Sequence, residues 1–363
     1  MKILFVTTIP SPYRVSFFNE LGKISDLTVL FEKNISNERD DSWSKYSFDH
    51  FKGIILKGKA VSVNTAFCPS VVKYLNKKWD QIIVCDISTL TGMLAIQHMK
   101  MHHIPYWIEG DGGFAKSGKG LKEIAKRHFI KGANGYFSTS AAHDNYYRTY
   151  GANPNLIYRY PFTSIGESDI VDHIYSIEEK QAIRKDLQMN EKRIIVAVGQ
   201  FIPRKGFDVL LKASHHLSDD YGFYIIGGEP TDDYLSLTKG KKNIHFIGFK
   251  TKPELRKYYL AADLFAFPTR EDIWGLVINE AMACGLPIIT TDKCIAGLEL
   301  VENEKNGYIV PVNAPKQTAQ KIKECFLENN LATYGKNSIA KIQDYTFEKM
   351  AVRHMEVLSN EKN

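Results

Sequence analysis

Runs of apolar residues alternate with amphipathic segments along this chain, and the alternation occurs twice. In the first half, KILFVTT (residues 2–8) and QIIVCD (81–86) are apolar at nearly every position, and stretches with helical character such as VVKYLNKKW (71–79) lie between such runs. A strand with no polar face is buried on both faces, as in parallel sheets that crossover helices cover. The pattern therefore predicts an α/β chain built from strand–helix–strand units.

The polar segment 166–190 interrupts this alternation, which restarts with RIIVAVGQ (193–200). A chain of 363 residues is also longer than one ordinary core accommodates. We predict two doubly wound, Rossmann-like domains that face each other across a cleft, at 1–165 and 166–344. The amphipathic helix within 345–363 is expected to pack back on the first domain. Ligands of such sheets bind beyond the carboxyl ends of the strands.

Several functional classes lack their signatures in this sequence. No GxGxxG follows the first strand and no GxxxxGK[ST] occurs, so the usual nicotinamide and P-loop fingerprints are missing. No apolar run approaches the roughly 18 residues of a membrane-spanning helix. The opening MKILFVTTIP is interpreted as a buried strand, because no cleavage site of small residues follows it. Five cysteines without a CxxC spacing predict neither disulfides nor a zinc site and favour a reducing, cytoplasmic setting.

The net charge of +6 is unevenly distributed along the chain. Residues 1–165 contain 21 Lys and Arg against 13 Asp and Glu, a net charge of +8, whereas the remainder is −2. A positive first half indicates an anionic surface or an anionic substrate, although solubility alone also accounts for a positive total. No nucleic-acid partner is expected.

The stretch TREDIWGLVINEAMACGLP (269–287) places acids on both sides of a glycine turn. We expect a short helix that begins near Val277 and ends at Gly285, a favourable residue after a helix end. The amides of Gly275, Leu276 and Val277 would then lie at the helix N-terminus. Unpaired N–H groups and the helix dipole attract an anion there, and Gly275 lets a ligand approach the backbone closely.

The charged residues around this turn suggest the rest of a ligand. Glu280 lies one turn into the helix, where a phosphate would repel it but the two hydroxyls of a ribose could donate to it. Asp272 precedes the turn and could reach the far end of the same ligand. Arg204 and Lys205 lie on the strand-to-helix loop of VGQFIPRKGFDVLLKA (198–213) and could neutralise a diphosphate. A plain turn and a solvated basic loop are the simpler interpretations.

Together these stretches resemble the retaining glycosyltransferases of family 4, which have the GT-B fold. The most specific part is the pattern Gly-Leu-Val-x-x-Glu-Ala-Met-Ala-x-Gly-x-Pro, and the strand–Gly–loop–Lys-Gly motif at 199–206 adds to it. FIGF at 246–249 and NGYIV at 306–310 extend the resemblance to nearly all of the second domain. The first domain matches in strand order only.

The resemblance implies a role for each matching residue. In the family, two acids separated by seven residues contact the donor. The second, which binds ribose, corresponds to Glu280, and the first, which contacts the donor sugar, corresponds to Asp272, with Glu271 as the adjacent alternative. The phosphate-binding lysine corresponds to Lys205. Where the family has an arginine after the strand glycine, this chain has Gln200, for whose missing charge Arg204 could compensate. The implied donor-binding set is Glu280, Arg204, Lys205, Gln200, Gly275, Leu276, Val277 and Phe249.

The resemblance places the acceptor on the first domain. The stretch IPSPYRVSFF stands where many members of the family have a glycine-rich loop. Its two prolines make it stiff, and Tyr13 and Arg14 follow them. Arg14 could contact an anionic acceptor or the donor phosphates, or it could be solvated at a helix start. IPYWIEGDGGF carries Glu109 and Asp111 at a strand end. Asp111 falls where the family often has a histidine and could hold hydroxyls as part of the catalytic set, with a structural turn as the alternative. Four histidines are expected on helix surfaces without a role: His102, His103, His128 and His143.

Residues 116–131 form a basic amphipathic segment. Such a helix is typical of an anionic membrane surface, and equally of a surface helix that covers its own sheet. The apolar positions on one helical face are Leu121, Ile124, Ala125 and Phe129. The basic positions around it are Lys119, Lys122, Lys126, Arg127 and Lys131.

The resemblance implies transfer of a hexosyl or N-acetylhexosaminyl group from a UDP- or GDP-sugar to a hydroxyl of a glycan or lipid-linked acceptor, with retention. No metal or other cofactor is expected. The implied setting is bacterial cell-surface polysaccharide synthesis, of capsule or lipopolysaccharide, in the cytoplasm and at the inner face of the membrane. The alternatives are a nucleotide-sugar epimerase on the same scaffold and a non-catalytic relative that binds sugar or nucleotide.

Overall fold

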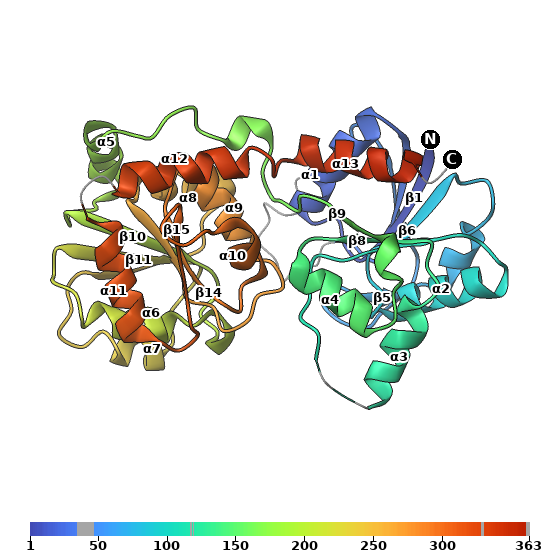
Figure 1. Cartoon of the computed structure of the whole chain (residues 1–363), viewed down its shortest axis with the longest axis horizontal. Coiled ribbons are helices and arrows are strands. Elements are labelled where there is room, and N and C mark those ends of the chain that lie inside the picture. The colour runs from blue at the N-terminus through green and yellow to red at the C-terminus, as the bar shows by residue number, and fades with distance from the viewer. Residues whose placement is uncertain (35–46, 117, 119, 328–329, 361–363) are drawn as a thin grey trace. The chain divides into compact units, whose positions relative to one another are not determined.

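The protein divides into two units, whose helices and strands are labelled in Figure 1. Unit 1 comprises Met1–Thr163 and Phe347–Asn363, and unit 2 comprises Ser164–Thr346. The final helix is therefore part of unit 1, although the whole of unit 2 precedes it in the sequence. The structure, a computed structural model, describes residues 1–34, 47–116, 118, 120–327 and 330–360.

Unit 1 contains a seven-stranded sheet in the order β3-β2-β1-β6-β7-β8-β9. All neighbouring strands run parallel. The sheet grows in one direction from β1 to β3 and in the other from β6 onward, which defines a topological switch point between β1 and β6. The strands are β1 (Lys2–Thr7), β2 (Asp26–Phe31), β3 (Lys52–Ile55), β6 (Gln81–Val84), β7 (Trp107–Glu109), β8 (Gly135–Ser138) and β9 (Ile157–Arg159), with a small hairpin of β4 (Lys59–Ala60) and β5 (Ala66–Phe67).

The helices of unit 1 are α1 (Pro12–Lys23), α2 (Leu90–Met101), α3 (Leu121–Ile130), α4 (Ala141–Thr149) and α13 (Phe347–Asn360). Helix α13 packs on α1. The helix expected at 71–79 is wrong, because only a 3₁₀ turn, Pro69–Lys73, forms there. Beyond it, Asn76 accepts from the Lys78 N–H at 3.1 Å and the Trp79 indole donates to the Tyr74 carbonyl at 2.8 Å. These side-chain bonds satisfy the backbone locally in a turn and replace a second helical turn.

Unit 2 repeats the design with six parallel strands in the order β12-β11-β10-β13-β14-β15 and a switch point between β10 and β13. Its strands are β10 (Arg193–Val198), β11 (Tyr221–Ile226), β12 (Ile244–Ile247), β13 (Leu264–Phe267), β14 (Ile288–Thr291) and β15 (Gly307–Val310). Its helices are α5 (Ile177–Leu187), α6 (Phe207–Ser214), α7 (Asp232–Ser236), α8 (Lys252–Ala261), α9 (Leu276–Ala283), α10 (Ile295–Leu300), α11 (Pro315–Cys325) and α12 (Asn330–Ile342).

The polar segment before β10 is an integral helix of unit 2. Ser176 and Glu179 form a capping box at the start of α5, in which each side chain accepts a backbone N–H of the other. Further along, Arg184 donates to the Ala261 carbonyl at 2.8 Å and pairs with Asp263 at 2.7 Å. The charged sequence therefore docks α5 on α8 through polar contacts.

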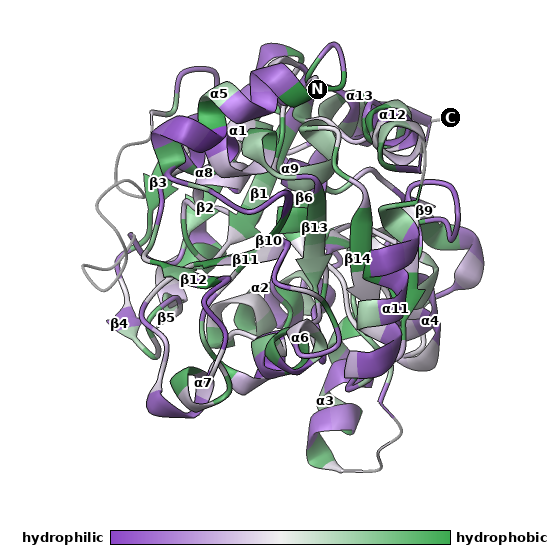
Figure 2. Cartoon of the chain, turned by 90° about the vertical axis from the view of Figure 1, so that its left-hand side faces the viewer, coloured by the Kyte–Doolittle hydropathy of each residue, from purple (hydrophilic) through white to green (hydrophobic). Residues whose placement is uncertain are grey.

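The continuous apolar strands of the sequence are the buried strands of both sheets. Every residue of β13 and β14 is buried, and Figure 2 colours β13 as hydrophobic. Full burial of one such side chain contributes about 1.5–3 kcal/mol. All five cysteines are buried free thiols. Across the described part of the chain, no helix combines the length and the apolar character that crossing a membrane requires.

Candidate functional site

The loops that follow β10 and β13 meet at the switch point of unit 2. We call residues 199–206 and 268–275 the β10–β13 edge. Gly206 has a φ of +70°, and a Cβ there would lie 2.1 Å from the Pro268 carbonyl oxygen. The Arg270 N–H donates to the Arg204 carbonyl at 2.8 Å. Glycine at 206 therefore allows the basic loop to close against the acidic one.

An ion pair forms the centre of this edge. The Lys205 ammonium lies 2.7 Å from Asp272 Oδ2, and Arg204 Nη1 lies 3.3 Å from the same oxygen. The Lys205 side chain is 16% exposed and that of Arg204 is 48% exposed. The solvated-loop interpretation is thus wrong for Lys205. Asp272 is itself buried, and a buried carboxylate of this kind requires a cation close by.

The turn before α9 has the geometry of an anion site. Gly275 has a φ of +106° and precedes the first helical residue, Leu276, with no side chain capping the helix. A Cβ at Gly275 would lie 2.8 Å from Cys294 Sγ. Both the positive φ and this close contact therefore disfavour any residue other than glycine here. The first N–H groups of a helix have no partner within it. The structure therefore brings the amides of Leu276 and Val277 to the same edge as Lys205.

Glu280 faces a pocket of about 190 Å³ within unit 2. Its two carboxylate oxygens accept from the Ser164 hydroxyl and the Tyr259 hydroxyl, each at 3.2 Å. Burial raises the pKa of Glu280, and Lys252 across the pocket opposes that shift. Two protein hydroxyl groups thus occupy the carboxylate of Glu280, for which the sequence predicts two ribose hydroxyls as partners. Sequence reasoning missed Ser164 and Tyr259, because nothing in the α8 sequence separates Tyr259 from a core residue.

The remaining predicted donor residues differ in exposure. Gln200 is exposed, and Phe249 is 50% exposed. Glu271 is partly buried, and its backbone carbonyl accepts from Arg204 at 2.9 Å. Trp274 is 2% exposed and its indole donates to Asn279 Oδ1 at 2.8 Å, which locks the turn onto α9.

The predicted acceptor-side residues gather at the carboxyl end of β7 in unit 1. Arg14 from α1 pairs with both Glu109 and Asp111. From α13, His354 Nε2 lies 3.1 Å from Glu109 Oε2, and its Nδ1 lies 2.8 Å from the Met350 carbonyl oxygen. We call Arg14, Glu109, Asp111 and His354 the Arg14 cluster. The Arg14 guanidinium offsets the charge of both carboxylates, and the His354 imidazole lies within hydrogen-bond distance of Glu109.

The electrostatics of the Arg14 cluster correct the interpretation of Arg14 as solvated. Arg14 is 4% exposed, so its guanidinium lies inside unit 1 and is committed to two carboxylates. Burial disfavours the charge of Glu109, but Arg14 and His354 outweigh it and lower the pKa of Glu109 to about 2. The Asp111 side chain keeps 28% of its surface exposed, and the Tyr13 hydroxyl donates to it at 2.8 Å. Asp111 is therefore the member of the cluster that can meet a ligand.

Two carboxyls that sequence reasoning missed lie at the same edge. Glu32 follows β2 and Asp86 follows β6, and burial raises their pKa values to about 7 and about 6. The prediction that His143 lies on a helix surface is wrong, because its side chain is only 1% exposed. Its Nδ1 accepts from the Thr139 N–H at 3.3 Å, and burial lowers its pKa to about 3. The carboxyl edge of unit 1 is thus mainly acidic, despite the net positive charge of its sequence.

Helix α3 covers its own unit only at its C-terminal end. Ile130 is fully buried and Phe129 packs against the core, whereas Leu121 is 85% and Ile124 is 58% exposed. The Lys126 ammonium lies 4.9 Å from the centre of the Tyr150 ring. Of the expected basic positions, Lys119 lies outside the described residues. The exposed apolar side chains of α3 are therefore not explained by docking on the sheet.

Comparison with known proteins adds a family match. The model for "Glycosyl transferases group 1" matches residues 179–341, which lie within unit 2. An uncharacterized glycosyltransferase of Methanocaldococcus jannaschii is 31% identical over 163 residues, 43% of this chain and 45% of the relative. An N,N'-diacetylbacillosaminyl-diphospho-undecaprenol alpha-1,3-N-acetylgalactosaminyltransferase of Campylobacter jejuni is 22% identical over 307 residues, 81% of this chain and 80% of the relative.

The first curated relatives, at 30–31% identity, match this chain over just under half of their own length. The fold extends further. The solved structure of Anabaena HepE in complex with UDP superposes with a TM-score of 0.79 at 17% identity, covering 99% of this chain and 100% of that one. The predicted GT-B fold is confirmed, and unit 2 carries similarity to group 1 glycosyltransferases. No group of three or more His, Cys, Asp or Glu in the described residues is placed to hold a metal ion.

Proposed function

We propose that this protein is a retaining glycosyltransferase of family 4 that transfers a sugar from a UDP- or GDP-sugar to a hydroxyl of a glycan or lipid-linked acceptor. Unit 2 binds the donor and unit 1 binds the acceptor. The observation that carries the proposal is that Lys205 and the N-terminus of α9 meet beyond the switch point of unit 2, with Glu280 one turn further along the same helix. The similarity of residues 179–341 to group 1 glycosyltransferases supports it.

Each donor residue has a task that follows from its position. The amides of Leu276 and Val277 and the ammonium of Lys205 stabilise the negative charge that develops on the leaving diphosphate, as preorganised donors do in other enzymes. Glu280 accepts from the ribose hydroxyls in place of Ser164 and Tyr259. Asp272 holds Lys205 near its working position before the donor binds.

The sugar and the acceptor are assigned on the same basis. Glu271 and Asp272 are the two candidates for the donor sugar, and Asp111 with Tyr13 holds the acceptor hydroxyl. The transferred group is a hexosyl or N-acetylhexosaminyl unit. Basic side chains of the protein supply the positive charge that a metal ion would otherwise provide. The Campylobacter jejuni relative, whose name includes a diphospho-undecaprenol acceptor, supports a lipid-linked acceptor in bacterial cell-surface polysaccharide synthesis.

The proposed location is the cytoplasm, at the inner face of the cell membrane. The buried free thiols of all five cysteines suit a reducing compartment. The exposed Leu121 and Ile124 beside the basic residues of α3 suit contact with an anionic leaflet.

A panel of UDP- and GDP-sugars tests the function. Purified protein is incubated with each donor, with and without extracted lipid-linked acceptors, and release of nucleoside diphosphate is measured. We expect release that depends on the acceptor, and a product whose anomeric configuration by NMR equals that of the donor. An epimerase would convert the donor with no acceptor present. A non-catalytic relative would bind the donor and leave it intact, and either outcome would refute the proposal.

A further inference from the structure

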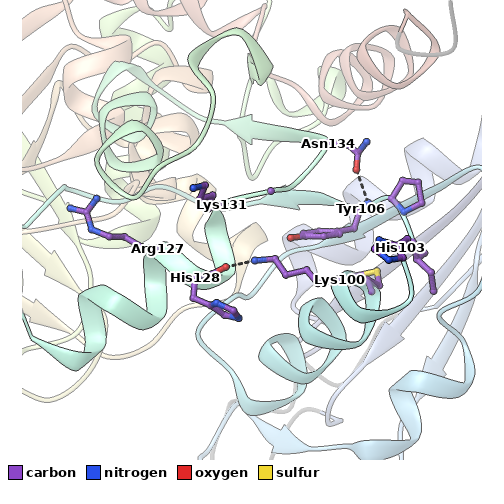
Figure 3. Close-up of a pocket in the computed structure, with 11 residues that line it drawn as sticks. Lys100, His103, Tyr106, Arg127, His128, Lys131 and Asn134 are labelled. Carbon is purple, nitrogen blue, oxygen red and sulfur yellow. Dashed lines mark hydrogen bonds between the residues drawn. The ribbon is translucent and has the colours of Figure 1, made fainter.

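A basic pocket of about 540 Å³ lies at the opposite end of the unit 1 sheet from Asp111. Tyr106 directly precedes β7 and Asn134 directly precedes β8, so the pocket lies at the amino ends of these strands. The predicted acceptor residues follow the carboxyl end of β7. Figure 3 shows the pocket between the loop after α2 and the C-terminal end of α3.

The lining of the basic pocket carries positive charge without compensation. Lys100, Arg127 and Lys131 line it, together with His103 and His128, and none of its 11 described lining residues is acidic. The Lys100 ammonium donates to the His128 carbonyl, which does not neutralise it. Burial and the neighbouring Lys131 lower the pKa of Lys100. An anion between these side chains would relieve their mutual repulsion.

A buried hydroxyl in the same pocket lacks a protein partner. Tyr106 is 2% exposed, and its hydroxyl oxygen has no hydrogen-bond partner in the described structure. Buried polar groups are hydrogen-bonded in the great majority of cases, so an orphan requires an explanation. Figure 3 shows the ring extending from its strand end toward the side of the pocket where Lys100 and His128 lie. The hydroxyl can donate to an anion that the cations hold.

We propose that the basic pocket binds a phosphate group, with Lys100, Arg127 and Lys131 supplying charge and Tyr106 a hydrogen bond. The volume accommodates a phosphate ester with a small organic substituent. The phosphate has two possible sources, the headgroup of an anionic lipid and a small soluble metabolite. Helix α3, which contributes Arg127, also exposes the apolar side chains of Leu121 and Ile124. Because exposed apolar side chains can contact a membrane, binding to a lipid headgroup is measured separately. The proposal does not depend on the glycosyltransferase assignment.

Two pocket variants and one matched control test the proposal. Tyr106→Phe keeps the ring and removes only the orphan hydroxyl, and Lys131→Gln removes one charge from the lining. Lys122→Gln removes the same charge from an exposed residue of α3 that does not line the pocket. Since the Tyr106 hydroxyl has no protein partner, Tyr106→Phe should leave the thermal unfolding midpoint unchanged or higher, so a loss of binding cannot come from misfolding.

The first arm measures glycerol 3-phosphate binding by calorimetry. A hydrogen bond to a charged group corresponds to about a tenfold or larger change in affinity, so we expect Tyr106→Phe and Lys131→Gln each to weaken binding by about tenfold. Lys122→Gln should match the wild type. Glycerol 3-phosphate should also raise the unfolding midpoint of the wild type more than that of the two pocket variants.

The second arm measures co-sedimentation with vesicles of phosphatidylglycerol and phosphatidylcholine, with pure phosphatidylcholine as the neutral reference. If the two pocket variants lose anionic-vesicle binding beyond the loss in Lys122→Gln, a lipid headgroup is the source. If only glycerol 3-phosphate binding distinguishes them, the ligand is a soluble phosphate ester. If neither arm separates Tyr106→Phe and Lys131→Gln from Lys122→Gln, the pocket is not a phosphate site and the proposal is overturned.

Discussion

In unit 1 the arginine beyond the carboxyl ends of the strands is buried between two carboxylates, with Asp111 the partly exposed member, whereas in unit 2 the comparable basic residues remain partly exposed beside the start of a helix. Arg14 is 4% exposed and its two carboxylates satisfy it. At the β10–β13 edge, Lys205 keeps 16% and Arg204 keeps 48% of the side chain exposed. Beside them lie a glycine turn and the start of a helix.

The two sheets have the same order over six strands, and unit 1 adds β9 at one edge, so the strand order does not explain this difference. In unit 1 an additional helix, α13, brings His354 against Glu109 and seals the cluster. In unit 2 Gly275, at a φ of +106°, begins α9 with no side chain capping the helix. We propose that charge at the carboxyl edge stabilises the fold in unit 1 and binds the donor in unit 2, and variants of each edge should separate the two roles.

The largest effect on stability is expected from Glu109→Gln. It would leave Arg14 and His354 buried without their common carboxylate, and removal of one partner of a buried pair costs about 3–5 kcal/mol. Urea unfolding followed by the fluorescence of unit 1 tryptophans measures the loss. Glu356→Gln on α13 is the control, since that side chain is 55% exposed and its pair contributes about 0–1 kcal/mol. A loss for Glu109→Gln no larger than the control would show that the cluster does not stabilise unit 1.

The same residue predicts an acid dependence of stability. The pKa of Glu109 is lowered from 4.5 to about 2 in the folded protein. The stabilisation is therefore fully present above about pH 4.5 and is lost as the pH falls toward 2. Unfolding free energies measured between pH 6 and 3 should fall more steeply in the wild type than in Glu109→Gln. Parallel curves would contradict the assignment.

The largest effect on activity is expected from Lys205→Ala. Loss of one preorganised donor to a developing charge lowers kcat by about 10²–10³-fold in comparable sites. Arg204→Ala is the matched variant, and we expect a loss below about tenfold because Arg204 is far more exposed. Nucleoside diphosphate release at saturating donor measures both. Equal losses of kcat in the two variants would mean that Lys205 has no role distinct from that of Arg204.

The acids of the β10–β13 edge should rank in a fixed order. Asp272→Asn removes the carboxylate that holds Lys205 and Arg204, and we expect it to lower kcat by about tenfold more than Glu271→Gln. Steady-state rates of the two variants with a common donor give the ranking. A greater loss in Glu271→Gln would assign the donor-sugar contact to Glu271 and leave Asp272 with the positioning of Lys205.

The smallest of these effects is expected from Glu280→Gln. A hydrogen bond to a charged acceptor is worth about 1.5–3 kcal/mol, and because glutamine keeps one acceptor oxygen we expect donor affinity to fall by about tenfold. Calorimetry with the nucleotide-sugar measures it, with the exposed Glu178→Gln of α5 as the control. Because burial raises the pKa of Glu280, wild-type affinity should weaken on acidification sooner than an ordinary carboxylate predicts. Unchanged affinity in a folded Glu280→Gln protein would remove Glu280 from the ribose site.

The features that depend on local pattern could be predicted from the amino-acid sequence alone. Continuous apolar runs became buried parallel strands, and Gly285 follows the end of α9 with a φ of +72°, as expected of a residue after a helix end. Gly275 marks the turn at which α9 begins. Periodicity and glycine chemistry act over a few residues, so they can be read without the fold. The expected helix at 71–79 failed because side-chain bonds of Asn76 and Trp79 outweighed the apolar spacing.

Which charged groups meet depends on the folded structure and could not be predicted from the sequence. Lys205 and Asp272 are 67 residues apart in the sequence, Arg14 and Glu109 are 95 apart, and His354 reaches Glu109 across 245. No local pattern distinguishes a cation that will be buried against a carboxylate from one that will face solvent. Strand register and helix packing fix these meetings, because they set which loop ends share one edge of a sheet. The same packing buries Arg14 inside unit 1 and leaves Lys205 partly exposed beside the turn at Gly275.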